Sequence, residues 1–238
     1  MPVHLYGVLS AGAVPPSSVR GLDGEPVRTL SVGAHAAWVS DIAARTLEAT
    51  PQRLLEHDAV LRAALAAEYF VVPSLFGRLH ADDASLRAAL ELSAGSLDEA
   101  MALVRGRVEM SMLVVASGMA DPGEYERSDD TLHDGGQPGR AHLERIRKQV
   151  HAERILRGNA SALLQSAARA LSELFVAERV VDSPAPPVLA ARAHLVAREN
   201  VARYERTVSL ECASADSELR VVVRGPGAAY SFAAVRFG

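Results

Sequence analysis

The sequence predicts a mixed α+β (α/β mixed) protein with an N-terminal α/β domain, residues 1–105, and a C-terminal domain, residues 106–238. Three patterns indicate this fold class. A helix start at Thr50-Pro51, with threonine as the N-cap and proline in the first turn, follows short apolar runs. Apolar and polar residues alternate through 107–116, as in a strand with one buried face. From there the predicted order is β-α(α)-β-β-α-β, typical of a modified ferredoxin-like sandwich.

The N-terminal domain begins with strands, because β-branched and aromatic residues dominate its first apolar runs. Strands are predicted at residues 3–9, 27–32, 36–39 and 71–72. The helix that begins at Thr50 extends to about Tyr69, with leucines recurring at helical spacing. Pro73 ends the strand that follows this helix, since proline cannot donate a ladder hydrogen bond. His57 lies on the helix and is expected to be a hydrogen-bonded interior residue.

Two helices are predicted to close this domain within residues 82–104. Asp82 or Asp83 caps the first helix, and Gly95-Ser96 separates it from the second. Ser96 with Glu99 three residues later matches a capping box for the second helix. Gly106 is expected to stop that helix, because glycine readily adopts the conformation that follows a helix end.

The C-terminal domain starts with the alternating strand at 107–116, and a mobile loop rich in Gly, Asp and Pro is predicted at 117–138. A charged helix at 140–157, broken or kinked at Gly158-Asn159, and a more apolar helix at 160–175 come next. The remaining predicted elements are antiparallel strands at 176–181 and 188–196, a helix at 199–213 and a strand at 218–224. Tyr230 and Phe232 then alternate with Ser231, as on one face of a short last strand.

Composition excludes several functional classes. The chain has 238 residues and a formal net charge of −4, which argues against a nucleic-acid or anionic-membrane surface. Its apolar runs are far shorter than the ~18 residues of a membrane span, and the first residues do not resemble a secretory signal. The single Cys212 excludes an internal disulfide and a multi-cysteine metal site, and it is expected to be a buried small apolar residue. A reducing, cytoplasmic location fits these observations.

No catalytic or cofactor motif stands out. The eight histidines lack metal-ligand spacing, and the acidic group around Asp129 and His133 is interpreted as a solvated loop. The glycine-rich run 135–139 precedes a helix but lacks the Lys-Ser/Thr ending of a phosphate loop. No Gly-x-Ser-x-Gly elbow is present in the sequence. We therefore predict no enzyme activity, no cofactor and no metal.

The charged helix at 140–157 carries six of the basic residues, diluted by Glu144 and Glu153. The basic residues are Arg140, Arg145, Arg147, Lys148, Arg154 and Arg157. Two interpretations remain open for this helix: a solvated face, or a surface for an acidic partner.

Six short blocks, in order along nearly the whole chain, resemble the gas vesicle accessory proteins F and L. They are Leu5-Tyr6-Gly7-Val8, His57 followed by Pro73-Ser74-Leu75-Phe76-Gly77, Val108-Glu109-Met110, Gly139-Arg140-Ala141-His142-Leu143, His194-Leu195-Val196-Ala197-Arg198, and Gly225-Pro226-Gly227-Ala228-Ala229-Tyr230-Ser231-Phe232. Two departures occur. Gly227-Ala228-Ala229 replaces the Trp-Pro-Pro of the family pattern, and His142 replaces an aromatic residue.

The resemblance implies a non-enzymatic accessory or minor structural protein of gas vesicle assembly, located in the cytoplasm at the gas vesicle. Such a protein would bind the small hydrophobic shell protein during nucleation, limit its aggregation and contact other accessory proteins. The resemblance also implies a two-domain fold with a ferredoxin-like C-terminal domain. The alternative function is a small-molecule or nucleotide-binding regulatory domain, which ferredoxin-like sheets often form.

The motif positions that the resemblance singles out, as structural or partner-binding residues, are His57, Pro73, Phe76, Gly77, Gly139, Arg140, Gly225, Pro226, Tyr230 and Phe232. Their side chains favour packing and turn chemistry over catalysis. Phe76 is expected to anchor a core, and Gly77 to allow a backbone angle that a Cβ would forbid. Tyr230 and Phe232 are expected to anchor the last strand and not to contact a partner.

Overall fold

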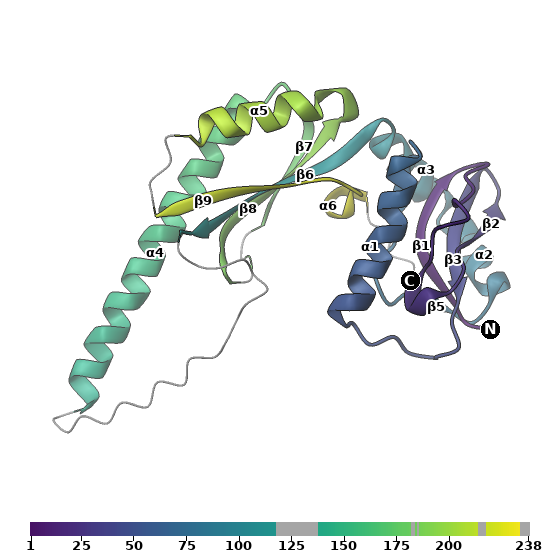
Figure 1. The fold of residues 1–238 in the computed structure, drawn as a ribbon, viewed down its shortest axis with the longest axis horizontal. Coiled ribbons are helices and arrows are strands. Elements are labelled where there is room, and N and C mark those ends of the chain that lie inside the picture. Colours follow the sequence, from purple (N-terminus) through teal and green to yellow (C-terminus); the bar gives the residue numbers. More distant parts are fainter. Residues whose placement is uncertain (118–137, 182–183, 185, 214–217, 234–238) are drawn as a thin grey trace.

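The computed structural model describes residues 1–117, 138–181, 184, 186–213 and 218–233, and it is a mixed α+β fold with two antiparallel sheets (Figure 1). The loop predicted at 117–138 lies outside the described residues, apart from its two end positions. The N-terminal sheet and the C-terminal sheet lie side by side, with helix α1 between them (Figure 1). None of the helices in the described ranges combines the length and apolarity that a membrane span requires.

The N-terminal sheet has the order β2-β3-β1-β4, and β5 also pairs with β1. Its strands are β1 (Val3–Ser10), β2 (Arg28–Val32), β3 (His35–Asp41), β4 (Val71–Pro73) and β5 (Leu79–His80). A single 3-10 turn, η1 (Leu22–Gly24), lies in the long connection before β2. The predicted strands are present, because the apolar runs of β1 and β3 are buried on both faces of the sheet.

Helices cover both faces of this sheet. Helix α1 (Pro51–Ala66) packs with Tyr6 and Trp38 on one face, whereas α2 (Asp83–Leu92) and α3 (Ala94–Val104) pack with Leu5 and Val8 on the other. Strand β1 therefore contributes side chains to two cores. An irregularity between Leu5 and Gly7 shifts the two-residue alternation, so that Leu5 and Val8 face the same core. The predicted cap of α1 is present, since the Thr50 side chain accepts a hydrogen bond from the Arg53 backbone N–H at 3.3 Å.

The predicted boundary between α2 and α3 needs correction. Asp82 caps α2 as expected, but the break falls at Ser93 and not at Gly95-Ser96. Ser96 lies in the first turn of α3, where its hydroxyl donates to the Ser93 carbonyl at 2.9 Å. A serine inside a helix can bond back to the preceding turn in this way, so it does not form the predicted capping box.

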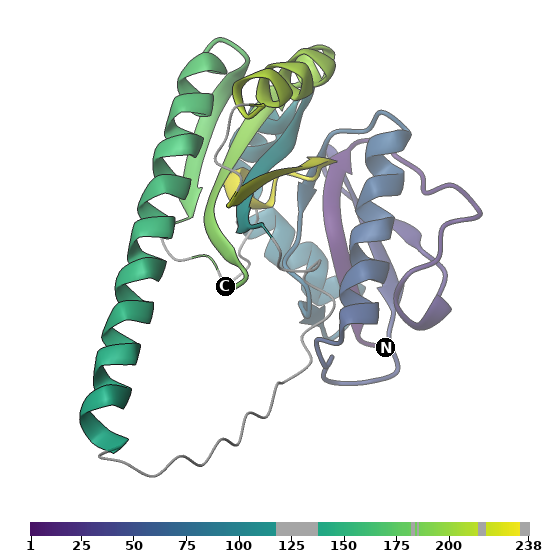
Figure 2. The ribbon, with the colours of Figure 1, turned by 60° about the vertical axis from the view of Figure 1, so that its left-hand side comes forward.

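The C-terminal sheet has the order β7-β8-β6-β9 with every pair antiparallel. Its strands are β6 (Arg107–Ala116), β7 (Phe175–Val181), β8 (Val188–Ala197) and β9 (Leu219–Gly227). Helix α4 (Pro138–Ala170) connects β6 to β7, while the turn η2 (Arg198–Asn200) and helix α5 (Val201–Glu211) connect β8 to β9. The predicted β-α-β-β-α-β order is therefore the observed order, and α4 and α5 lie together over one face (Figure 2).

Two predicted elements of this half are wrong. The break at Gly158-Asn159 is absent, because α4 runs continuously from Pro138 to Ala170. The buried contacts of Ala160 and Leu164 with the sheet outweigh the cost of about 1 kcal/mol for a helical glycine. The last strand is also wrong, since residues Tyr230–Ala233 form a short helix, α6.

Candidate functional site

Eight of the ten motif positions converge where the two sheets meet. His57 lies on α1, Pro73 ends β4, and Phe76 and Gly77 follow in the next turn. Gly225 and Pro226 end β9, and Tyr230 and Phe232 belong to α6. The other two, Gly139 and Arg140, lie in the first turn of α4, far from the junction (Figure 1).

A buried pair of histidines lies in the N-terminal half, within reach of α6. His4 Nε2 and His57 Nδ1 are 2.9 Å apart, and His57 Nε2 is 3.1 Å from the Ser74 carbonyl oxygen. A carbonyl can only accept, so His57 carries its proton on Nε2 and accepts on Nδ1. His4 must then donate from Nε2. Each imidazole is thereby held in one tautomer by the strands and the helix around it.

Burial keeps both imidazoles neutral. Burial lowers the pKa of His4 to about 3, and repulsion from a positive charge on His57 lowers it further in the same direction. Burial also lowers the pKa of His57 to about 4. A buried imidazolium is unfavourable because it has lost its hydration. Among the described residues, the hydrogen-bond partners of the two rings include no carboxylate that would compensate this loss. The pair is therefore a neutral hydrogen-bonded element of the core at pH 7.

Aromatic rings surround the pair. Tyr6 lies edge-on to His4 at 4.8 Å between ring centroids, Phe76 lies 5.9 Å from His57, and Tyr230 lies 6.4 Å from His57. Tyr230 comes from α6, so the last helix reaches the histidines of the N-terminal half. Within the described residues, no group of three or more His, Cys, Asp and Glu side chains could hold a metal ion. These rings pack against one another and leave the histidines without a reacting partner.

A carboxylate of β6 fixes the start of α6. Glu109 Oε2 accepts from the Ser231 backbone N–H at 2.8 Å, and Oε1 accepts from the Ser231 hydroxyl at 2.7 Å. Burial raises the pKa of Glu109, while the two Ser231 hydrogen bonds oppose that shift. This contact favours a helix after Gly227. The first backbone N–H groups of a helix have no partner inside the helix, and the Glu109 carboxylate accepts from one of them, that of Ser231.

The backbone at Gly225 approaches β6 closely. Its φ is +126°, and a Cβ placed there would lie 2.7 Å from the Glu109 carbonyl oxygen. Both observations require glycine. Gly77 also has a positive φ, +85°, in the predicted turn after β4, although space around it is open.

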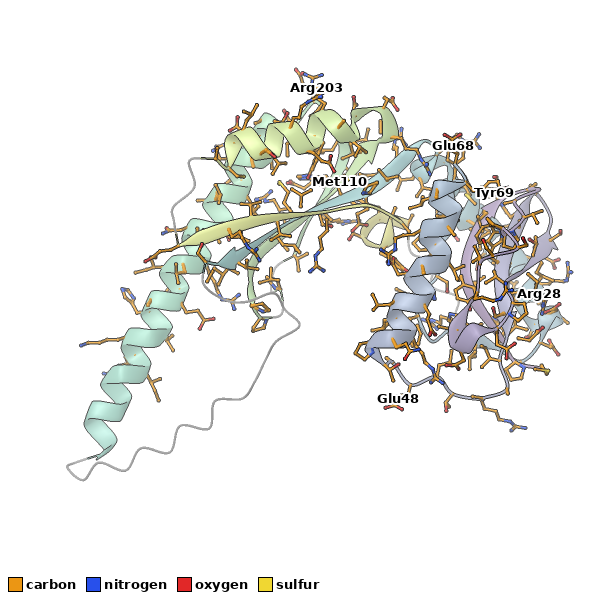
Figure 3. All side chains as sticks on the ribbon, viewed as in Figure 1. Arg28, Glu48, Glu68, Tyr69, Met110 and Arg203 are labelled. Atoms are coloured by element: carbon orange, nitrogen blue, oxygen red, sulfur yellow. The ribbon has the colours of Figure 1, made fainter. Side chains whose placement is uncertain are left out.

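Arg198 provides a second link between the halves. Its guanidinium donates to the carbonyl oxygens of Leu65 at 2.9 Å and Tyr69 at 3.0 Å, at the C-terminal end of α1. Helix-terminal carbonyls lack intrahelical donors and carry partial negative charge, so a guanidinium suits them. Figure 3 shows Glu68 and Tyr69 at the end of α1 that is nearest to the C-terminal sheet.

An open cleft lies along this junction. A volume of about 450 Å³ between α1 and the end of β9 is bordered by the charged residues Asp58, Arg62, Glu109 and Arg224. A second cleft of about 520 Å³ shares Arg62 and Pro226 with the first. Asp58 pairs with Arg62 at 2.9 Å, and Glu109 is already occupied by Ser231. Among the described cleft residues, the Ser111 hydroxyl also donates to Glu109 Oε1, at a long 3.5 Å. The arrangement joins the two halves of the molecule.

Several residues of this junction were not predicted from the sequence. His4 had a usable signal, because it is a polar residue inside an otherwise apolar strand and so requires a buried partner. Glu109 and Arg198 were quoted within family blocks but not as contacts. Tyr230 and Phe232 are partly buried against two different cores, so they anchor α6 and not a strand.

Comparison with known proteins identifies the family. The model of the family "Gas vesicle synthesis protein GvpL/GvpF" matches residues 2–234. Gas vesicle protein L of Streptomyces sp. (strain CB03234) is 30% identical over 245 residues, covering 92% of this chain and 88% of that protein.

Two crystal structures share the fold. GvpF from Anabaena sp. PCC7120 matches with a TM-score of 0.75 at 19% identity, covering 99% of this chain and 97% of the other. GvpF from Microcystis aeruginosa matches with a TM-score of 0.75 at 17% identity, covering 98% and 99%. The ordered motif blocks, the two-sheet fold and the full-length family match agree, and the chain belongs to the GvpL/GvpF family of gas vesicle synthesis proteins.

Proposed function

We propose that this protein binds the hydrophobic shell protein during gas vesicle assembly and limits its aggregation until the subunits are built into the wall. It does so in the cytoplasm, together with other gas vesicle accessory proteins. Membership of the GvpL/GvpF family over residues 2–234 supports the process. We infer that binding uses an exposed edge of the C-terminal sheet.

Strand β7 is that edge. Among the described strands it pairs only with β8, and it carries Val176 at 58% and Val180 at 52% exposure. Exposed apolar side chains on an edge strand are unusual, because an unprotected edge recruits other strands. The opposite edge, β9, presents the exposed arginines Arg220 and Arg224. The observation that carries the proposal is therefore the apolar free edge of β7, which suits addition of a strand from a hydrophobic partner.

The test uses shell protein diluted from denaturant, with light scattering followed over time. The full chain is expected to lower the scattering in proportion to its concentration. Val176→Lys/Val180→Lys places two charges on the edge and is expected to remove most of this effect. Leu92→Lys changes the 90% exposed last residue of α2 and serves as the matched control, which should behave as the original chain.

Two outcomes contradict parts of the proposal. Equal scattering with and without the chain, together with no retention of shell protein on immobilised chain, rejects shell-protein binding. Full protection by the lysine variant of β7 retains shell-protein binding but rejects the edge as its site. Circular dichroism of each variant establishes that the fold is intact.

A further inference from the structure

Half of helix α4 projects beyond the sheet that its other half covers (Figures 1 and 2). The C-terminal half is buried, with Ala160, Leu164 and Ala167 no more than 1% exposed. In the projecting half, Ile146 is 42% and Val150 is 59% exposed. The same helix therefore changes from a packed element to one that, among the described residues, has no surface against it.

The exposed apolar pair lies on the same side of the helix as the buried face. An α-helix completes five turns in 18 residues. Ile146 lies 18 residues before Leu164, and Val150 lies 18 residues before Ala168, so each shares the angular position of a buried residue. On the same side of the helix, the Glu153–Arg157 ion pair separates Ile146 and Val150 from the buried residues. Ile146 and Val150 therefore form a short, separate apolar stripe on the projecting half. A stripe at this i, i+4 spacing is what helix pairing uses.

Basic side chains border the stripe. Arg147 and Arg154, seven residues apart, lie along one side of it, and neither has an ion-pair partner among the residues that the structure describes. Arg157 is already held by Glu153 at 3.0 Å. The projecting part of α4 is rich in arginine although the whole chain carries a formal charge of −4. An apolar stripe beside unpaired arginines complements a surface that is apolar and negatively charged.

We propose that the projecting half of α4 docks an acidic amphipathic helix of a partner protein. Apolar residues of that helix pack on Ile146 and Val150, and its carboxylates face Arg147 and Arg154. Two helices packed side by side have their axes about 8–10 Å apart, which lets charged residues beside the stripe reach across. This docking surface is separate from the edge of β7, so a test of helix docking on α4 is independent of a test of shell-protein binding at β7.

The chemistry of the stripe disfavours two other occupants. Helices that lie on membranes present a wide apolar face with bulky residues such as Trp, Phe and Leu. Ile146 and Val150 make a narrow aliphatic stripe. A second copy of α4 packed on the first would bring like charges together, which is destabilising.

The experiment measures binding of the full chain to a synthetic amphipathic peptide of about three heptads, with leucines on one face and glutamates beside them. Fluorescence anisotropy reports the affinity at two salt concentrations. We expect binding that weakens as salt rises, because charge pairs near the surface are screened. A peptide of the same pattern with lysines in place of glutamates should bind at least tenfold more weakly.

Two double variants locate the site. Ile146→Ser/Val150→Ser removes the stripe, Arg147→Glu/Arg154→Glu reverses its border, and each is expected to weaken binding of the acidic peptide by about tenfold or more. Lys148→Glu/Ile155→Ser is the matched control. It changes one basic and one exposed aliphatic residue of the same helix, also seven apart, on the opposite face. This control should bind as the original chain does. Helicity and thermal unfolding are compared for all three.

Other results overturn the proposal. Equal loss in the control variant, or equal binding of the lysine peptide, shows nonspecific attraction. Binding to vesicles of anionic lipid, without binding to the acidic peptide, assigns the surface to a membrane. Dimerisation that Arg147→Glu/Arg154→Glu abolishes assigns it to a second copy. No peptide binding rejects a partner helix. If binding then appears once the six acidic residues of segment 118–137 are neutralised, that segment competes for the surface, and the proposal of an open docking site is wrong.

Discussion

The neutral histidine pair makes the N-terminal half sensitive to mild acid. The pKa values of His4 and His57 fall from 6.5 to about 3 and about 4 in the folded chain. Unfolding exposes both rings to water, so the unfolded chain binds more protons than the folded chain between these values and 6.5. Stability is therefore complete above pH 6.5 and is lost as the pH falls toward 4.

The magnitude follows from proton linkage. Each such histidine lowers the free energy of unfolding by about 1.4 kcal/mol for every pH unit below 6.5. Because the unfolded rings are already half protonated at pH 6.5, His4 and His57 together remove about 2 kcal/mol between pH 6.5 and 5.5. That loss is a large part of the ~5–15 kcal/mol by which a typical domain is stable.

The perturbation is His57→Gln, which cannot titrate but can still donate and accept hydrogen bonds. At pH 7.5 the variant should be less stable by about 1–3 kcal/mol, because the glutamine amide fits the two partners less well. The variant should take up about one proton fewer on unfolding, so its free energy of unfolding should fall less steeply with acid. The free energies of the variant and the original chain should therefore approach each other near pH 5.5. Urea unfolding followed by the fluorescence of Trp38 measures this directly. Trp38 is the single tryptophan and is buried in the same half.

The control for this prediction is His151→Gln on α4. Its side chain is exposed, and therefore solvated in the folded and the unfolded chain alike. The control should leave the free energy of unfolding at pH 7.5 unchanged. A His57→Gln variant whose stability falls as steeply with acid as the original would refute the assignment of proton uptake to the pair.

Three further changes test the junction between the sheets. Arg198→Met removes two charge-assisted hydrogen bonds to the end of α1 and should lower the free energy of unfolding by about 2–4 kcal/mol in a urea titration. Arg203 is exposed, so Arg203→Met should change that free energy by no more than about 0.5 kcal/mol. Gly225→Ala should lower Tm because its Cβ would lie 2.7 Å from a backbone oxygen. Gly227→Ala, whose Cβ would have its nearest atom at 3.9 Å, should lower Tm less. Equal changes in Tm would contradict the steric argument. Glu109→Gln should loosen α6 and speed its proteolysis near the C-terminus, and unchanged cleavage would count against the carboxylate as its anchor.

Local patterns predicted most of the elements. The strand β6 was predicted with its observed limits, because its alternation is regular and Gly106, with a φ of +69°, separates it from α3. The Thr50 and Asp82 caps were predicted because a cap is a contact between residues three positions apart. The order of elements in the C-terminal half followed from the same kind of local signal.

The errors arose where distant contacts decide the structure. Gly158 usually weakens a helix, but packing of the flanking residues on the sheet keeps α4 continuous. The residues after Gly227 alternate like a strand, yet Glu109, more than 100 positions earlier, satisfies the first turn of a helix there. The pairing of His4 with His57 likewise joins residues 53 positions apart, which no local pattern encodes. Division of the chain into domains at residue 105 and the ferredoxin-like description of the second domain stay predictions.

This protein belongs to a family of gas vesicle synthesis proteins, and we propose that it serves vesicle formation by protecting the shell subunit. The most direct measurement is the pressure-sensitive light scattering of cells that make gas vesicles, in a strain lacking the gene for this chain. We expect scattering to be lost in that strain, to return with the original chain and with Leu92→Lys, and not to return with Val176→Lys/Val180→Lys. Normal vesicles in the strain without the gene would contradict it.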